Sequence, residues 1–223
     1  GNIKQKLQLP DSQLKMIYNG YNEWFRPIEN DKQQYRKYIA DAGYFFFLGN
    51  TDPKKNTERT LVAYAKYLEL SEVKRPLLMA DLDQEYLNGI IERNGIEAIR
   101  DHIVIPGYII NSDLPYIYNN AFAFLYTSLR ESFGIPLLEA MACGTPVITS
   151  NKSSMPEIAG HDAILINPES SDEIALKMLQ LERDTDFYQR QKAVGLERAK
   201  LFSWRKTTEN LLRLYEEVYK EIK

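Results

Sequence analysis

Residues 131–149 read ESFGIPLLEAMACGTPVIT, and this stretch has the boundary signals of one short helix between two apolar runs. Pro136 suits the first turn of a helix, where its missing N–H would have no partner within the helix. Gly144 suits the left-handed position just after a helix ends. The pattern predicts a helix of about two turns that follows a strand at 122–126 and leads into a strand at 146–149. Together these elements form a βαβ unit with parallel strands.

The same alternation of short apolar runs with longer amphipathic stretches continues through most of the chain. The runs predicted as strands are 14–18, 44–48, 76–80, 103–105, 122–126, 146–149 and 163–166. Most of them are apolar throughout, as strands covered on both faces tend to be. Between them lie stretches whose apolar residues recur at helical spacing, most clearly at 56–70. We therefore expect a Rossmann-like α/β fold, in which a parallel sheet carries helices on both faces.

The two ends of the chain depart from this alternation. Beyond about Ser171 no strand is predicted, and the rest of the chain reads as successive helices that form a helical C-terminal tail. The last helix, 204–222, carries an apolar stripe made of Leu211, Leu212, Tyr215, Val218, Tyr219 and Ile222. We expect this tail to pack along the edge of the domain. The polar stretch 21–37 contains Pro27 and lacks a clean period, so it is predicted to be a linker.

The composition is that of an ordinary globular protein, with 26% charged and 44% hydrophobic residues in 223. The net charge of −3 gives no basic field of the kind that usually drives binding to nucleic acid or anionic lipid. The single cysteine, Cys143, cannot form an internal disulfide. No stretch approaches the roughly 20 apolar residues of a membrane span. We predict a cytoplasmic protein with no nucleic-acid partner and no membrane span, and the initial Gly1 suggests a piece of a longer protein.

The loop before the short helix has the composition of an anion site. Residues 132–135 lie where the strand ends and the helix begins, so their amides and the helix dipole can hold a diphosphate. Two carboxylates, Glu131 and Glu139, flank this place. Carboxylates accept hydrogen bonds from hydroxyl groups. A ligand with a central diphosphate and hydroxyl-rich rings on both sides satisfies both kinds of group, and a nucleotide sugar has that structure.

These residues resemble the donor-binding C-terminal lobe of retaining GT-B glycosyltransferases of family four, the glycosyl transferases group 1. The resemblance rests on the pair Glu131 and Glu139 with FGIP between them and AMACGTPV after them. It extends to further short motifs over nearly the whole chain: YNG at 18–20, FRP at 25–27, FLGNTDPKKN at 47–56, PGYI at 106–109, LPYIY at 114–118, MPE at 155–157 and FSW at 202–204.

Carried over by position, the resemblance implies a role for each residue that matches a family motif. Glu131 would act on the donor sugar, and Lys55 would neutralise the diphosphate leaving group. Glu139 would bind the ribose hydroxyls. The backbone of Ile109 would contact the base, and Ser132, Phe133, Gly134 and Ile135 would meet the sugar and phosphates. The resemblance implies no cofactor and no divalent metal, and neither His102 nor His161 has a spacing that would suggest a metal site.

The first loop of the lobe contains one departure from the family pattern. Gly49 and Asn50 are predicted to contact the substrate, but many family members have an arginine where this chain has Asn50. An arginine would give two charge-assisted hydrogen bonds to phosphate, whereas an amide is a weaker and neutral donor. The sequence therefore predicts weaker diphosphate binding through this loop, for which Lys54 is a candidate replacement.

Three hypotheses on function follow. The first is the donor lobe, residues 28–223, of a retaining hexosyltransferase, with residues 1–27 as the end of an acceptor lobe and the connection. That enzyme would move a hexosyl group from a nucleoside diphosphate sugar to a glycan, lipid or polysaccharide acceptor, in the cytoplasm or at the inner membrane face. The fragment alone would be inactive. The alternatives are the corresponding lobe of a nucleotide-sugar epimerase or hydrolase, and a non-catalytic nucleotide-binding or protein-interaction module. Base, sugar and acceptor stay open.

Overall fold

Six short parallel strands form one sheet in the computed structural model, which describes residues 7–8, 10, 13–29 and 33–222. The strands are β1 (Tyr44–Leu48), β2 (Leu77–Ala80), β3 (Ile103–Val104), β4 (Ala121–Tyr126), β5 (Val147–Ser150) and β6 (Ile164–Ile166). Their order across the sheet is β3-β2-β1-β4-β5-β6, and every neighbouring pair is parallel. The order reverses between β1 and β4, which is the place where ligands bind in open α/β sheets.

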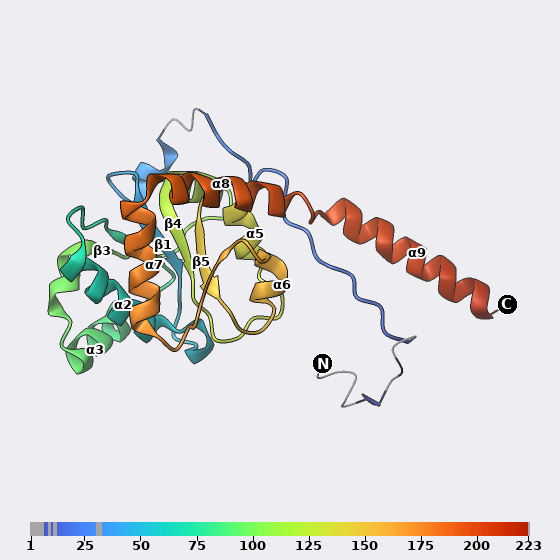
Figure 1. Ribbon diagram of the computed structural model, residues 1–223, viewed down its shortest axis with the longest axis horizontal. Coiled ribbons are helices and arrows are strands. Elements are labelled where there is room, and N and C mark those ends of the chain that lie inside the picture. Colours follow the sequence, from blue (N-terminus) through green and yellow to red (C-terminus); the bar gives the residue numbers. More distant parts are fainter. Residues whose placement is uncertain (1–6, 9, 11–12, 30–32, 223) are drawn as a thin grey trace.

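Helices connect the strands and cover both faces of the sheet, as Figure 1 shows. They are η2 (Gln34–Lys37), η3 (Pro53–Lys55), α2 (Thr57–Leu70), α3 (Gln84–Asn94), η4 (Glu97–His102), α4 (Leu114–Asn120), α5 (Ile135–Ala142), α6 (Met155–Ala159), α7 (Ser171–Arg183), α8 (Thr185–Ala199) and α9 (Trp204–Ile222). The predicted Rossmann-like fold is confirmed, and all but the first of the predicted strands form within one or two residues of their expected ends.

Two hydrophobic clusters, one on each face, explain why the strands are mostly apolar. Along β1, Tyr44 and Phe46 belong to one cluster and Phe45 and Phe47 to the other, and all four side chains are buried. The first cluster includes residues of α4, α5 and α6, and the second includes residues of α2, α3 and α7. Because successive side chains of a strand point to opposite faces, a strand covered on both faces is mostly apolar. The polar residues Thr149 and Ser150 of β5 are buried with their hydroxyl groups hydrogen-bonded.

The α5 segment folds as its boundary signals predict. Pro136 lies in the first turn, and Gly144, just beyond the helix end, has a left-handed backbone with φ of 75°. The face of α5 that packs in the core consists of Leu137, Leu138, Ala140, Met141 and Ala142. A side chain at Gly195 of α8 would come within 3.3 Å of Met141, so this glycine lets α8 lie close against α5.

The strand predicted at 14–18 does not form. This segment runs beside α9 instead: the Lys15 ammonium lies 3.5 Å from the Glu217 carboxylate, and the Thr207 hydroxyl donates to the carbonyl of Tyr18 at 2.7 Å. A strand requires a neighbouring strand for its hydrogen bonds, and Met16 is 70% exposed, so the apolar run is not a buried one.

The C-terminal tail behaves as predicted only in part. Helices α7 and α8 pack on the lobe, whereas α9 extends away from it (Figure 1). The stripe predicted to pack along the edge is exposed at Leu211, Leu212, Tyr215, Val218 and Tyr219, between 38% and 61%. The side chain of Ile222, the last member of the stripe, lies outside the described residues. Helical periodicity predicted the helix and its apolar face. It did not predict which residues cover that face, because periodicity carries no information on neighbouring elements.

We predict that Asn56 holds the carboxyl-end loops of the sheet together. Its buried amide nitrogen donates to the carbonyls of Thr127, at 3.1 Å, and Pro168, at 2.7 Å, while its backbone has φ of 63°. The variant Asn56→Ala should lose about 2–4 kcal/mol of unfolding free energy, because two buried carbonyls lose their donor and alanine tolerates the left-handed region poorly. Urea unfolding measures this change.

Asn210→Ala provides the control for this prediction, because Asn210 is an exposed residue of α9 and loses the same atoms. A loss for Asn56→Ala no larger than that for Asn210→Ala would contradict the assigned role.

Candidate active site

The loops that follow β1 and β4 meet at the point where the strand order reverses. The β1 loop contains Lys55, in η3, and the β4 loop contains Glu131. The Lys55 ammonium lies 2.8 Å from Glu131 Oε1, and the two side chains are only 20% and 13% exposed. The same ammonium lies 5.6 Å from the centre of the Tyr126 ring. The structure thus brings together the two residues predicted to be catalytic, although they are far apart in the sequence.

Hydroxyl groups from the loop after β5 hold the backbone of the Glu131 loop. The Ser153 hydroxyl donates to the Glu131 carbonyl at 2.6 Å, and the Glu131 amide donates back to Ser153 Oγ at 3.3 Å. The Ser154 hydroxyl lies 3.1 Å from the Glu131 carbonyl and 3.3 Å from the Phe133 carbonyl. Sequence reasoning missed these two serines. A signal was present, since they stand between a strand and a proline-started helix, the place where strand-end loops meet.

The turn from the β4 loop into α5 requires a glycine. Gly134 has φ of 103°, and a Cβ added there would lie 2.7 Å from the Met155 methyl group. Its neighbours predicted to meet the sugar and phosphates differ in exposure: Ser132 is exposed, whereas Phe133 and Ile135 are half-buried. The Phe133 ring packs against Phe202, with ring centres 6.1 Å apart. The part of Phe133 that could contact an anion is therefore its backbone amide and not its ring.

Glu139 lies one turn further along α5, in a different environment from Glu131. Burial raises the pKa of its carboxyl to about 7, and a long contact of 3.5 Å from the Tyr118 hydroxyl opposes that shift. Burial also raises the pKa of the Tyr118 hydroxyl. Tyr118 packs against Phe46 and Phe124 in the core, which fixes its ring. The two predicted carboxylates thus have different environments: Glu131 is ion-paired, whereas Glu139 is largely desolvated.

A cavity of about 310 Å³ opens beside Glu139, and we call it the Glu139 cavity. Ile109, whose backbone was predicted to contact a base, lines the same cavity and is 4% exposed. The other lining residues are Asn22, Trp24, Phe25, Leu48, Ala80, Asp81, Tyr108, Asn111, Leu114 and Pro136. Sequence reasoning missed Trp24 and Phe25, because they come from the stretch interpreted as a linker. Two of the predicted contacts, Ile109 and Glu139, therefore share one cavity.

The first loop is shaped by its glycine and its asparagine. A Cβ at the buried Gly49 would overlap the Phe47 ring at 2.0 Å, so a side chain has no room there. Asn50 is exposed, and its side-chain oxygen accepts a hydrogen bond from the Asp52 amide at 2.9 Å. Lys54 is paired with Asp52 at 2.8 Å. The side chains of Asn50 and Lys54 therefore bond within their own loop. The cation that pairs with Glu131 is Lys55.

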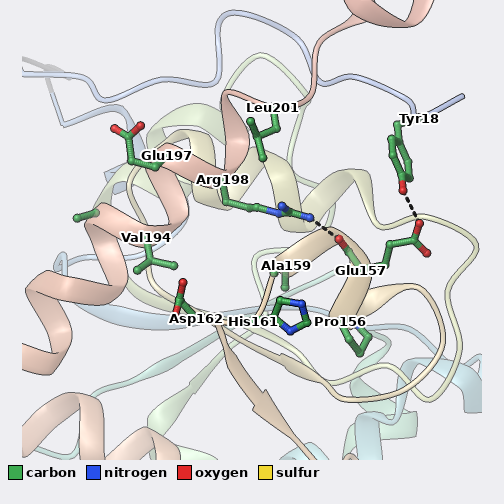
Figure 2. A pocket seen from close by; sticks show the side chains of 12 residues that line it. Tyr18, Pro156, Glu157, Ala159, His161, Asp162, Val194, Glu197, Arg198 and Leu201 are labelled. Atoms are coloured by element: carbon green, nitrogen blue, oxygen red, sulfur yellow. Dashed lines mark hydrogen bonds between the residues drawn. The ribbon is translucent and has the colours of Figure 1, made fainter.

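A larger hollow of about 810 Å³ lies between α6 and the end of α8, as Figure 2 shows. Glu157 accepts a hydrogen bond from the Tyr18 hydroxyl at 2.5 Å there, and Arg198 donates to the Glu157 carbonyl (Figure 2). Arg198 also donates to the Ile158 carbonyl at 2.8 Å. His161 lines this hollow, but none of the predicted site residues does. The candidate active site is therefore the smaller Glu139 cavity together with the Lys55 and Glu131 pair.

The described residues contain neither a metal-binding cluster nor a helix that could cross a membrane. Among those residues, no group of three or more histidine, cysteine, aspartate and glutamate side chains is arranged to hold a metal ion. In the same part of the chain, no helix combines the length and apolarity needed to cross a bilayer.

Comparison with known families decides the identity of the lobe. The sequence profile of the family described as "Glycosyl transferases group 1" matches residues 28–198. The chain belongs to this family. The match contains both loops that meet at the switch point and the whole of α5, so Lys55, Glu131 and Glu139 lie within the family region, whereas the cavity residues Asn22, Trp24 and Phe25 precede it.

Curated relatives of this group 1 chain are named for sugar transfer. The O-antigen chain mannosyltransferase B of Escherichia coli is 34% identical over 79% of this chain and 46% of its own length. The mannosylfructose-phosphate synthase of Agrobacterium fabrum is 31% identical over 91% of this chain and 47% of its own length. The chain spans less than half the length of these relatives.

Solved structures share the fold at lower identity. A sucrose-phosphate synthase from Thermosynechococcus elongatus has a TM-score of 0.81 at 22% identity, covering 99% of this chain and 56% of its own. The C-terminal domain of a group 1 glycosyl transferase from Francisella tularensis has a TM-score of 0.68 at 23% identity, covering 80% of this chain and 95% of its own. The resemblance to a GT-B C-terminal lobe is thus confirmed.

We predict that Glu139 makes the stability of the lobe depend on pH. Its pKa of about 7 lies above the ordinary value of 4.5, so the folded state binds this proton more tightly than the unfolded state does. The contribution of Glu139 to stability should therefore fall as the pH rises from about 4.5 to about 7, by about 1–3 kcal/mol at most. The variant Glu139→Gln should lack this dependence.

Urea unfolding of both proteins at pH 5 and pH 8 measures the effect as the difference between them. Glu69→Gln, at an exposed position of α2, is the control, because it removes an exposed carboxylate and keeps Glu139. Parallel pH profiles for the unaltered chain and Glu139→Gln would contradict the prediction.

Proposed function

We propose that this lobe binds a nucleoside diphosphate sugar and that the full-length protein is a retaining hexosyltransferase acting on an acceptor hydroxyl. The observation that supports this best is the arrangement along the turn at Gly134: Glu131, paired with Lys55, lies on its N-terminal side, and Glu139, which lines the cavity, lies on its C-terminal side. A ligand that bridges the two sides needs an anionic middle and hydroxyl groups on both flanks.

The diphosphate is assigned to the turn itself. The first amides of α5 point toward the carboxyl ends of the strands, and the positive end of a helix dipole favours an anion by about 0.3–1 kcal/mol, up to about 2 when partly buried. Lys55 adds a full positive charge beside this turn. The Lys55 ammonium pairs with Glu131 at 2.8 Å, and an incoming phosphate can take over part of this hydrogen bonding.

The two carboxylates are assigned to the two rings of the donor. Glu139, which lines the cavity, would accept hydrogen bonds from the ribose hydroxyls, and Glu131 would accept them from the donor sugar. A carboxyl with a pKa near 7 gains from such bonds, because hydroxyl donors stabilise its charged form. Glu131 is free for the sugar once Lys55 turns to the phosphates.

Catalysis then consists mainly of stabilising the departing diphosphate. Negative charge accumulates on that group as the bond to the sugar breaks, and fixed donors aimed at developing charge are effective because they need no reorganisation. In this lobe those donors are Lys55 and the amides of residues 133–135. The other lobe would supply the acceptor and close the cleft against water.

The relatives support the finer parts of this proposal. One of them is named as a mannosyltransferase, and mannose is a hexose, which favours a hexosyl group here. A protein of the same fold from Anabaena was crystallised with UDP and glucose. We assign residues 28–223 to the donor lobe and residues 1–27 to the end of the acceptor lobe and the connection. We place the full enzyme in the cytoplasm or at the inner membrane face, with a glycan or lipid acceptor.

We expect saturable binding of at least one of UDP, GDP and ADP, or of their sugars, in calorimetric titrations of the 223-residue chain. Glu139→Ala should weaken that binding by about 1–3 kcal/mol, the scale of lost hydrogen bonds to a charged group. Glu69→Ala, on the exposed side of α2, should leave it unchanged.

Absence of binding to every one of these ligands would favour the non-catalytic alternative. Transfer to an acceptor by the full-length protein, measured against epimerisation or hydrolysis of the same donor, separates the enzymatic hypotheses.

We further expect Lys55 to act on the diphosphate and not on the nucleoside. Lys55→Ala should lower the affinity for the best-bound nucleoside diphosphate by about 1.5–3 kcal/mol, while the affinity for the corresponding nucleoside stays the same. The neighbouring Lys54→Ala is the matched control, because Lys54 is paired with Asp52 and exposed. Equal losses in the two lysine variants, or equal losses for nucleoside and diphosphate, would argue against a phosphate role for Lys55.

A further inference from the structure

The Glu139 cavity has a polar rim that the proposed contacts to ribose and diphosphate do not use. Its walls are apolar where Leu48, Ala80 and Pro136 line it, at the ends of β1 and β2 and the start of α5. At the rim lies the carboxylate of Asp81, the residue that follows β2. The volume of about 310 Å³ falls at the lower end of the roughly 300–1,000 Å³ usual for small-molecule sites, which suits a single nucleoside.

Asp81 differs from the other aspartate of its loop in having no structural task. The Asp83 carboxylate accepts a hydrogen bond from the Tyr86 amide at 2.9 Å and so caps α3. Within the described residues, the Asp81 side chain makes no hydrogen bond and no ion pair. Yet its backbone is held in the left-handed region, with φ of 58°, and its amide donates to the Gly107 carbonyl at 3.4 Å. A backbone held in a sparsely populated region points to a position fixed for a purpose.

Two exposed aromatic side chains indicate that the cavity takes a flat ring. Trp24 and Tyr108 line it, and they are 58% and 65% exposed. Large aromatic side chains are usually buried more deeply, and a nucleobase stacks well on them because every base presents a flat π face. A base that stacks on one of these side chains would lie in the cavity that Asp81 also lines.

The chemistry of a carboxylate decides which base edge fits. An ionised carboxylate has two acceptor oxygens and no donor. Guanine presents two adjacent donors, N1–H and the 2-amino group, so both oxygens are satisfied. Uracil presents one N–H between two carbonyls, which repel a carboxylate. Adenine presents an amino group beside the acceptor N1, so one oxygen faces a lone pair. Specificity of this kind comes as much from the unfavourable contacts as from the favourable ones.

We propose that the Glu139 cavity selects guanine nucleotides and that Asp81 is the residue that determines this specificity. The inference rests on the proposed nucleotide-sugar function of the same site. It names the donor as a guanosine diphosphate sugar. The Asp81 carboxylate accepts from guanine N1–H and the 2-amino group, while Glu139 accepts from the ribose of the same nucleotide.

Calorimetric titration of the 223-residue chain with GDP, UDP, ADP and inosine diphosphate tests this proposal. GDP should bind about 5- to 150-fold more tightly than UDP and ADP, the discrimination expected of one bidentate pair. Inosine diphosphate, which lacks the 2-amino group, should bind less tightly than GDP. Asp81→Asn should remove both preferences, and asparagine tolerates a left-handed backbone, so the loop keeps its shape.

Asp83→Asn is the matched control, because it removes the same charge two residues away and asparagine still caps α3. It should keep the preference for GDP. Equal binding of the three nucleotides, tighter binding of UDP or ADP, or a preference that survives in Asp81→Asn would overturn the guanine proposal while leaving nucleotide binding intact. Absence of binding to any nucleotide would overturn the proposed function, and the base proposal with it.

Discussion

The left-handed turn at Gly134 is the constraint on which the candidate site depends. It lets the chain leave β4 and enter α5 within a few residues, and Met155 packs where any side chain would have to be. This tight turn places Glu131 before the helix and Glu139 within it, on two sides of the first amides of α5. With a wider turn the two carboxylates would not flank a single anion site.

The two glutamates show how surroundings give the same side chain different properties. Glu131 is paired with Lys55, so its charge is balanced by a cation from another loop. Glu139 has no cation among its recorded partners, and burial raises its pKa to about 7. The first arrangement suits a group that exchanges its partner when a phosphate arrives. The second suits a group that strengthens its hydrogen bonds to hydroxyls as it becomes charged.

The sheet alone does not build this site. Trp24 and Phe25 come from the segment before the sheet and form part of the cavity wall. Phe25 is buried, with its ring centre 5.9 Å from that of Tyr118, the residue whose hydroxyl faces Glu139. The segment ahead of it follows α9, to which Tyr18 is joined through Thr207. The segment 13–29 and the last helix are thus connected to the Glu139 cavity.

The sequence by itself determined the elements whose signals are local. Apolar runs predicted β1 to β6 because strands covered on both faces are mostly apolar. Pro136 and Gly144 predicted the bounds of α5, and Glu131 and Glu139 with the residues between them predicted a site that stays a prediction. Only the tertiary structure decided which distant groups meet. Lys55 reaches Glu131 because β1 and β4 are neighbours, and the segment 14–18 is no strand because no strand lies beside it. Local pattern fixes backbone conformation, whereas the proximity of loops and the burial that shifts a pKa depend on the order in which strands pair.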